Sequence, residues 1–293
     1  MLPTKTQLIG LKADRFRHPL DLEATINLRR LPGLDLLVRN LLGGVSEDFL
    51  YLNNIAASVL IGEKQLPDIH KLLVEACQIL DLEVPQLYLK QNPAPNAYTM
   101  AMRGKKPFIV VHTSLVDLLT PAELQAVIAH ELGHLKCEHG VYLTLANIIV
   151  LATSGLMPAG IGNAIAQNLQ AQMLQWLRCA EFSCDRAALL VSQDPKTVIS
   201  VLMKLSGGSP ILAPMLNVDA FLDQARAYEA IGTTNFGKML AAAQTEQLSH
   251  PVPVLRAKEI DLWSQTDNYQ SLLNNPTMRY DKQAINSGGW RNW

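Results

Sequence analysis

The feature that most constrains this chain is the run HELGH at residues 130–134. A strong helix start precedes it at residues 120–123, TPAE, where the threonine suits the N-cap, the proline suits the first turn and the glutamate completes a capping box. We therefore expect one helix that ends near Gly140. Residues four apart lie on the same face of a helix, so His130 and His134 can present two imidazole nitrogens to one ion.

Glu131 supplies the third chemical group of this run. It is close enough to reach a metal-bound water without being a ligand itself. Zinc lowers the pKa of such a water towards neutrality, and a carboxylate can then take the proton during attack on a carbonyl. The run therefore predicts one zinc ion per chain and hydrolysis of peptide bonds, with Glu131 as the general base.

A catalytic zinc ion usually has three protein ligands and one open position. The metzincin spacing would need glycine at position 137 and histidine at position 140, but this chain has Cys137 and Gly140. His139 comes five residues after His134, about 140° around a helix, and we expect a surface or helix-end histidine there. Cys137 could approach the metal, but a core thiol is the preferred interpretation.

The expected third ligand is Glu181, in the run RCAEFSCDRA at residues 178–187. Asp185 follows it by four residues, so both carboxylates would share one helix face. Glu181 could ligate zinc, while Asp185 could accept a hydrogen bond from a ligating imidazole and fix its tautomer. A solvated Glu/Asp pair is the alternative, but apolar residues on both sides indicate a buried helix.

The remaining pattern predicts a mainly helical α+β domain. Apolar residues at helical spacing cover residues 63–80. Short apolar runs at 86–90, 97–103 and 108–112 predict strands, and the last two could form a hairpin across a Gly-Lys-Lys turn. We expect a small antiparallel sheet beside the helix that carries HELGH, and further helices as far as about residue 265.

We expect three parts along the 293 residues: an N-terminal arm at 1–62, a zinc-binding domain at 63–268 and a polar C-terminal tail at 269–293. Hydrophobic residues make up 48% of the chain and charged residues 17%, which is apolar for a soluble protein. The net charge is −1 and no basic stripe is interleaved with aromatic residues, so a nucleic-acid partner is not expected.

The ordered set of motifs resembles the HtpX and CAAX prenyl protease type I family of gluzincin metallopeptidases. The motifs are HELGH, then EFSCDRA at 181–187, then a His-Pro pair at 250–251 with an arginine six residues after the histidine, together with NAY at 96–98. The resemblance covers roughly residues 65–265. It implies a zincin-type fold with His130 and His134 as zinc ligands, Glu181 as the third ligand and Asp185 as its support.

The resemblance also implies where a polypeptide would bind. The strand at 107–112, with Phe108 and Val110, would be the edge along which an extended substrate pairs through backbone hydrogen bonds. Asn96 and Ala97 would contact the substrate beside that strand. Unfolded or extended polypeptides would then be the substrates of a metalloendopeptidase.

Two further residues, His250 and Arg256, would lie near the metal, and one of them could stabilise the oxyanion. The alternative is that the His-Pro pair caps a helix and that Arg256 is a structural ion-pair partner. Two other classes of function also stay open: a non-catalytic, chaperone-like or scaffold protein that keeps the metal, and a structural zinc site with Cys137 or His139 as the fourth ligand. The retained Glu131 argues against both.

Many members of the resembled family are integral membrane proteins. The candidate span here, residues 141–157, is at the short limit for a membrane helix, and the return segment 159–178 is too polar to cross lipid cheaply. We therefore expect a helical hairpin at 141–178 with an apolar first arm. That arm could pack on the core, or segment 141–160 could contact a membrane surface or a protein partner. Four scattered cysteines and an N-terminus without a signal-peptide pattern favour a cytoplasmic or peripheral-membrane protein in a reducing compartment.

Overall fold

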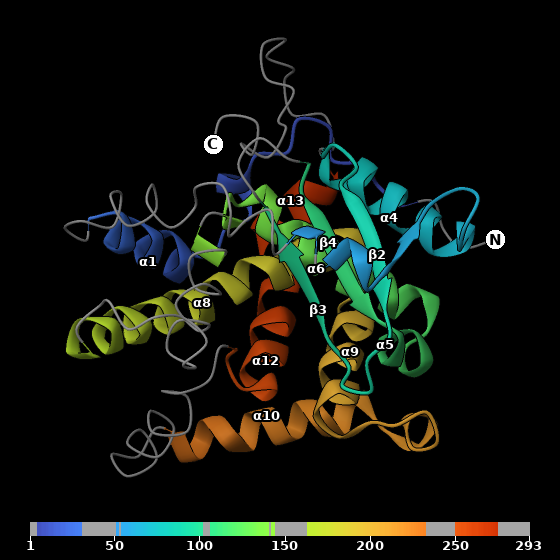
Figure 1. Ribbon diagram of the computed structural model, residues 1–293. Helices are drawn as coiled ribbons and strands as arrows, with labels where there is room; N and C mark the ends of the chain where they lie inside the picture. Colours follow the sequence, from blue (N-terminus) through green and yellow to red (C-terminus); the bar gives the residue numbers. More distant parts are fainter. Residues whose placement is uncertain are drawn as a thin grey trace.

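The computed structural model describes residues 5–30, 51–52, 54–101, 106–140, 142–143, 163–232 and 250–274. This part of the chain is mainly helical with one small sheet, as the sequence predicts (Figure 1). The α-helices are α1 (Pro19–Arg29), α4 (Pro67–Leu80), α5 (Thr113–Leu118), α6 (Pro121–Lys136), α8 (Asn163–Ser192), α9 (Pro195–Gly207), α10 (Val218–Gly232), α12 (Pro253–Ser264) and α13 (Asp267–Asn274). The strands are β1 (Val59–Ile61), β2 (Gln86–Lys90), β3 (Ala97–Met100) and β4 (Phe108–His112).

The sheet is mixed, which corrects the expectation of a purely antiparallel one. Its described strands lie in the order β1-β2-β4-β3. The pairs β1–β2 and β3–β4 are antiparallel, whereas β2 and β4 run parallel, with Tyr88 opposite Val110. All five residues of β4 are buried and the first four are apolar, which suits the middle of a sheet. The more exposed β3 therefore takes the edge.

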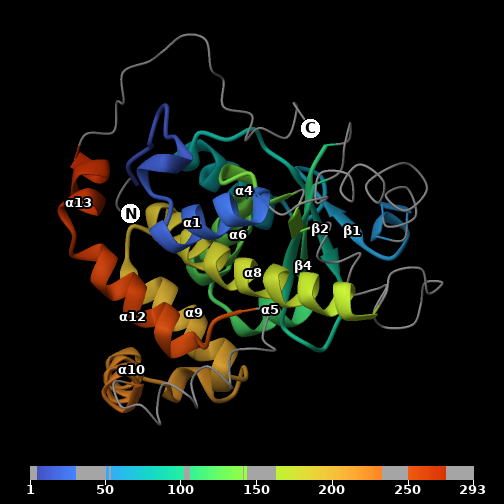
Figure 2. The same ribbon diagram turned by 90° about the vertical axis from the view of Figure 1, so that its left-hand side faces the viewer.

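Helix α6, which carries HELGH, begins as the sequence predicts. Thr120 caps it by accepting a hydrogen bond from the backbone N–H of Glu123, and the Glu123 side chain completes the capping box. The helix lies against β3 and crosses α8 at very close range (Figure 2). A Cβ atom on Gly133 would come within 2.8 Å of the Cα of Cys184 and 3.0 Å of the Cβ of Ala187. Glycine at 133 is thus the residue that lets α6 and α8 approach.

Segments of the expected arm and tail belong to the same hydrophobic core. Leu8, Leu11 and Phe16 are no more than 1% exposed, and α1 packs along α8 (Figure 2). At the other end, Tyr269 and Leu272 of α13 are buried in that core. The boundary expected at residue 268 therefore falls inside a packed helix.

Some expectations fall outside the described residues. The Gly-Lys-Lys turn lies almost wholly outside them, and so does the contact segment expected at 141–160. None of the helices that the structure describes is long and apolar enough to cross a membrane.

Candidate metal centre

Three polar side chains from α6 and α8 converge where the two helices cross. The Nε2 atom of His130 lies 3.2 Å from Oε2 of Glu181, and Nε2 of His134 lies 3.4 Å from Oε1 of the same carboxylate. The ring centroids of His130 and His134 are 5.4 Å apart. His134 and Glu181 are 4% and 2% exposed. The structure therefore brings together the three residues that we expect to be metal ligands.

The environment of Glu181 fits a bound cation. Within the described part of the chain, its Oε2 atom is buried and makes no hydrogen bond, although His130, Arg256 and His250 each place a nitrogen within 3.2–3.6 Å of it. Burial opposes its ionisation, but His250, His130 and Arg256 hold its pKa well below the ordinary value. A buried anionic oxygen needs a partner. Two imidazoles and one carboxylate form a donor set of catalytic zinc sites.

A thiol also lies near this centre. Among the described residues, the ligand atoms of His130, His134 and Cys184 lie within 4.8 Å of one another. Burial, with the charge of Glu181 beside it, raises the pKa of the Cys184 thiol well above its ordinary value. Glu181 is the better third ligand because its two carboxylate oxygens face the Nε2 atoms of both histidines, and two histidines with a glutamate are a ligand set of catalytic zinc sites.

His130 is supported directly by a carboxylate. Its Nδ1 atom lies 3.1 Å from Oδ1 of Asp185, and Asp185 accepts hydrogen bonds from Nε and Nη2 of Arg256 at 2.8 and 2.6 Å. Burial disfavours a charged imidazole, but Glu181 and Asp185 raise the pKa of His130 to about 10. Arg256 thus forms two buried ion pairs, with Asp185 and with Glu181. These contacts agree with the alternative that Arg256 is a structural ion-pair partner.

His134 is supported by a second histidine, and here the expectation of a surface residue is wrong. His139 is 0% exposed, and its Nδ1 atom lies 3.1 Å from Nδ1 of His134. Helix α6 ends at Lys136, and Glu138 adopts a left-handed conformation with φ 60°. The chain therefore folds back, and the backbone N–H of His139 donates to the carbonyl of His134. Cys137 is a buried core thiol, as expected.

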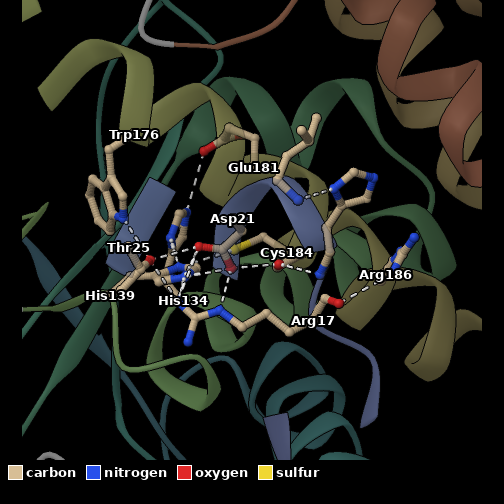
Figure 3. Close-up of polar contacts among 12 residues, drawn as sticks. Arg17, Asp21, Thr25, His134, His139, Trp176, Glu181, Cys184 and Arg186 are labelled. Carbon is tan, nitrogen blue, oxygen red and sulfur yellow. Dashed lines mark hydrogen bonds and ion pairs between the residues drawn. The ribbon is translucent and has the colours of Figure 1, made fainter. Parts of the chain in front are cut away.

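Beyond His139 lies Asp21, a residue of α1 that the sequence did not single out. It accepts hydrogen bonds from Arg17 at 2.8 Å and Ser183 at 2.6 Å, and lies 3.1 Å from Nε2 of His139 (Figure 3). Burial opposes the charge of Asp21, but His139 and Arg17 hold its pKa well below the ordinary value. Burial also lowers the pKa of His139, although Asp21 opposes this. The one local clue is an arginine and an aspartate four residues apart at a helix start.

Glu131 faces a cleft of about 240 Å³ beside the three converging residues. Its Oε2 atom accepts a hydrogen bond from the Thr99 hydroxyl of β3 at 2.7 Å, which ties the carboxylate to the sheet edge. Both polar and aliphatic residues line the cleft. The lining includes Asn96, Ala97, His130, Glu131, Glu181, Asp185, His250 and Arg256, together with Leu115, Ala126, Val127, Val198, Val201 and Leu202.

The expected substrate-binding residues divide into two groups. Asn96 and Ala97 lie at the cleft. Phe108 and Val110 do not: both are fully buried in a separate cluster on the face of the sheet away from the main core. The expectation that residues 107–112 form the edge strand is wrong, because β4 is flanked by β2 and β3.

Comparisons with known proteins agree with the resemblance noted in the sequence. Residues 63–264 match peptidase family M48. The chain is 57% identical over 275 residues to the plastoglobule-localized metallopeptidase 48, chloroplastic, of Arabidopsis thaliana, covering 94% of this chain and 79% of that relative. It is 31% identical over 170 residues to protease HtpX homolog 2 of Methanosarcina acetivorans, covering 50% of this chain and 58% of that relative. No solved structure gives a match.

Proposed function

This chain belongs to peptidase family M48 and is a metallopeptidase, and we propose that its metal is a single zinc ion held by His130, His134 and Glu181. The observation that carries the proposal is the convergence of two imidazole Nε2 atoms on a buried carboxylate whose Oε2 lacks a hydrogen bond. The family and the names of the relatives do not favour a non-catalytic protein.

Glu131 is the proposed general base. A zinc ion bound here would supply a water of lowered pKa and would polarise the substrate carbonyl. Thr99 holds Oε2 of Glu131 by a hydrogen bond, so Oε1 is the atom that we expect to take the proton and pass it to the leaving amine. Asp185 and Arg256 orient His130 rather than meet the substrate, and His250, whose side chain is 57% exposed, is the better candidate to contact a transition state.

The proposed substrate is an unfolded or extended polypeptide, cleaved internally. β3 is the edge strand beside the cleft, and an extended peptide can pair with such an edge through backbone hydrogen bonds. Asn96 and Ala97 would then contact the substrate backbone. Aliphatic residues in the cleft lining, such as Val127, Val201 and Leu202, suit an apolar side chain of the substrate.

Metal content and proteolysis test this proposal together. We expect one zinc ion per chain in the wild type and in Glu131→Gln, and we expect Glu131→Gln to hydrolyse a casein-like unfolded substrate about 10²–10⁴-fold more slowly. The matched control Glu63→Gln, at an exposed carboxylate, should change neither quantity. Equal activity of the wild type and Glu131→Gln would rule out Glu131 as the base. Unchanged zinc affinity in Glu181→Ala would rule out Glu181 as a ligand.

A cytoplasmic or peripheral-membrane location remains part of the proposal. The four free cysteines fit a reducing compartment. The Arabidopsis relative is named as plastoglobule-localized. Flotation of the full chain with lipid vesicles tests the peripheral contact through residues 141–160; recovery of all the protein in the unbound fraction would contradict it.

A further inference from the structure

His134 and His139 present their Nδ1 atoms to each other in the buried interior, at 3.1 Å. On its other side, His139 presents Nε2 to both carboxylate oxygens of Asp21, at 3.2 and 3.1 Å (Figure 3). Nη2 of Arg17 also lies 3.3 Å from Nε2 of His139, but it already donates to Asp21 and Thr25. An ionised carboxylate only accepts hydrogen bonds, so the two shorter contacts with Asp21 are satisfied when Nε2 of His139 carries the hydrogen. Three residues from two distant parts of the chain therefore form one line of hydrogen bonds.

The direction of these bonds follows from the chemistry of imidazole. A neutral His139 with its hydrogen on Nε2 has a bare Nδ1, so Nδ1 of His134 must be the donor between the two rings. The thiol of Cys184, whose Sγ is 3.9 Å from that same nitrogen, can only be a second donor to it. His134 then has no hydrogen on Nε2, the atom that faces Glu181. This tautomer is the one that can bind a metal through Nε2.

Asp21 is itself fixed by several donors. Arg17 binds it through two nitrogens, Ser183 of α8 donates to Oδ2, and Thr25 donates to Oδ1. His139 is also held by packing, because the Trp176 ring meets it edge-on at a centroid distance of 5.4 Å. The carboxylate and the imidazole therefore have little freedom to turn away from His134.

We propose that Asp21, acting through His139, is a positioning residue for the metal ligand His134. This inference rests on the proposed function, since it takes His134 to be a ligand. Helix α1 lies outside residues 63–264, which match the family, so a segment before the matched region would complete the metal centre. Outer partners of ligating histidines typically change metal affinity by about 10–100-fold when they are removed.

Substitutions of His139 in the full chain test the proposal, with zinc affinity measured by competition against a chelating dye. Glutamine can accept through Oε1 and donate through Nε2, as neutral His139 does. His139→Gln should therefore stay within about threefold of the wild type, whereas His139→Leu should bind zinc about 10–100-fold more weakly. His139→Asn is polar but shorter, and should resemble His139→Leu because it cannot reach both partners. It also covers the case in which the leucine variant does not fold.

A matched control separates positioning from packing. Thr266 donates a hydrogen bond to the carbonyl of Trp263 and accepts one from the backbone N–H of Tyr269, so Thr266→Val should lower the melting temperature of the metal-free protein and leave zinc affinity unchanged. Wild-type affinity in His139→Asn, or equal weakening in His139→Gln and His139→Asn, would overturn the proposal. Suppose that the His139 variants give one of these overturning results. If the wild type still binds zinc and Glu131→Gln is inactive, the positioning inference alone is wrong and the proposed function stands. If the wild type binds no zinc, the proposed function is wrong as well.

Discussion

The two histidines of the metal centre are supported in different ways. His130 meets a charged carboxylate directly, Asp185, which Arg256 holds by two hydrogen bonds. His134 meets a neutral imidazole first and reaches a carboxylate one residue further on, at Asp21. In both cases the supporting aspartate is paired with an arginine: Asp185 with Arg256, and Asp21 with Arg17.

The residues that support the two histidines also come from different parts of the chain. Asp185 and Arg256 lie on α8 and α12, inside the region that matches the family, whereas Asp21 lies on α1, before that region. A carboxylate in direct contact raises the basicity of a ligating imidazole more than a neutral partner does. We therefore expect zinc affinity to depend more strongly on the support of His130, and the four predictions below are ordered by their expected effect.

Gly133→Ala should disturb both supports together and have the largest effect. The added Cβ would lie 2.8 Å from the Cα of Cys184, so α6 and α8 must separate. Such overpacking costs about 3 kcal/mol of unfolding free energy at the upper end of its usual range, and Glu181 would move away from both histidines. Urea unfolding and zinc competition measure the two effects. Gly62→Ala, where a Cβ meets nothing within 4 Å, is the control, and wild-type behaviour of Gly133→Ala would contradict the close packing.

Asp185→Ala removes the direct support of His130. Zinc affinity should fall about 100-fold, the upper end for an outer partner. The unfolding free energy should fall by about 3 kcal/mol, because Arg256 stays buried with only Glu181 as its ion-pair partner in the described part of the chain. Asp223→Ala, which breaks an exposed pair with Arg226, should cost less than about 1 kcal/mol. Equal effects of the two variants would mean that Asp185 does not act on the metal centre.

Asp21→Asn weakens the indirect support. An amide can still accept from His139, but it is neutral and turns an N–H₂ group towards the donors of Arg17 and Ser183. We expect zinc affinity to fall about tenfold, the lower end for an outer partner. Asp14→Asn, at an exposed position three residues before Arg17, should leave the affinity unchanged. A loss as large as that of Asp185→Ala would erase the difference between the two supports.

The same variant has a smaller effect on pH dependence. Burial opposes the charge of Asp21, but His139 and Arg17 keep its folded-state pKa below the ordinary value of 3.8. The stabilisation from a depressed carboxyl pKa is present above the unfolded pKa and lost as pH falls towards the folded one. In the metal-free protein, the difference in unfolding free energy between wild type and Asp21→Asn should therefore shrink below about pH 4. A constant difference between pH 7 and pH 3 would contradict this.

The sequence predicts the parts of the site that depend on local spacing. His130 and His134 are four apart on one helix, and so are Glu181 and Asp185, so a helical period alone brings each pair to one face. The capping box of α6 is equally local. The meeting of α6 with α8 rests on a single glycine at 133, whose importance appears only once the approaching backbone is known.

The parts that the sequence does not predict depend on the chain turning or on distant packing. His139 is beside His134 because Glu138 takes a left-handed conformation that is unusual for a glutamate. Asp21 reaches it because α1 packs along α8, more than a hundred residues later in the chain. The sheet differs from expectation because the fully buried β4 takes a central place between β2 and β3.

X-ray absorption at the zinc edge of the full chain, loaded with one equivalent of zinc, tests the central claim most directly. With His130, His134 and Glu181 as the ligands, the first shell should hold nitrogen and oxygen atoms at about 2.0–2.2 Å and no sulfur. A zinc–sulfur distance of about 2.3 Å would instead place Cys184 in the ligand set and contradict the assignment of Glu181.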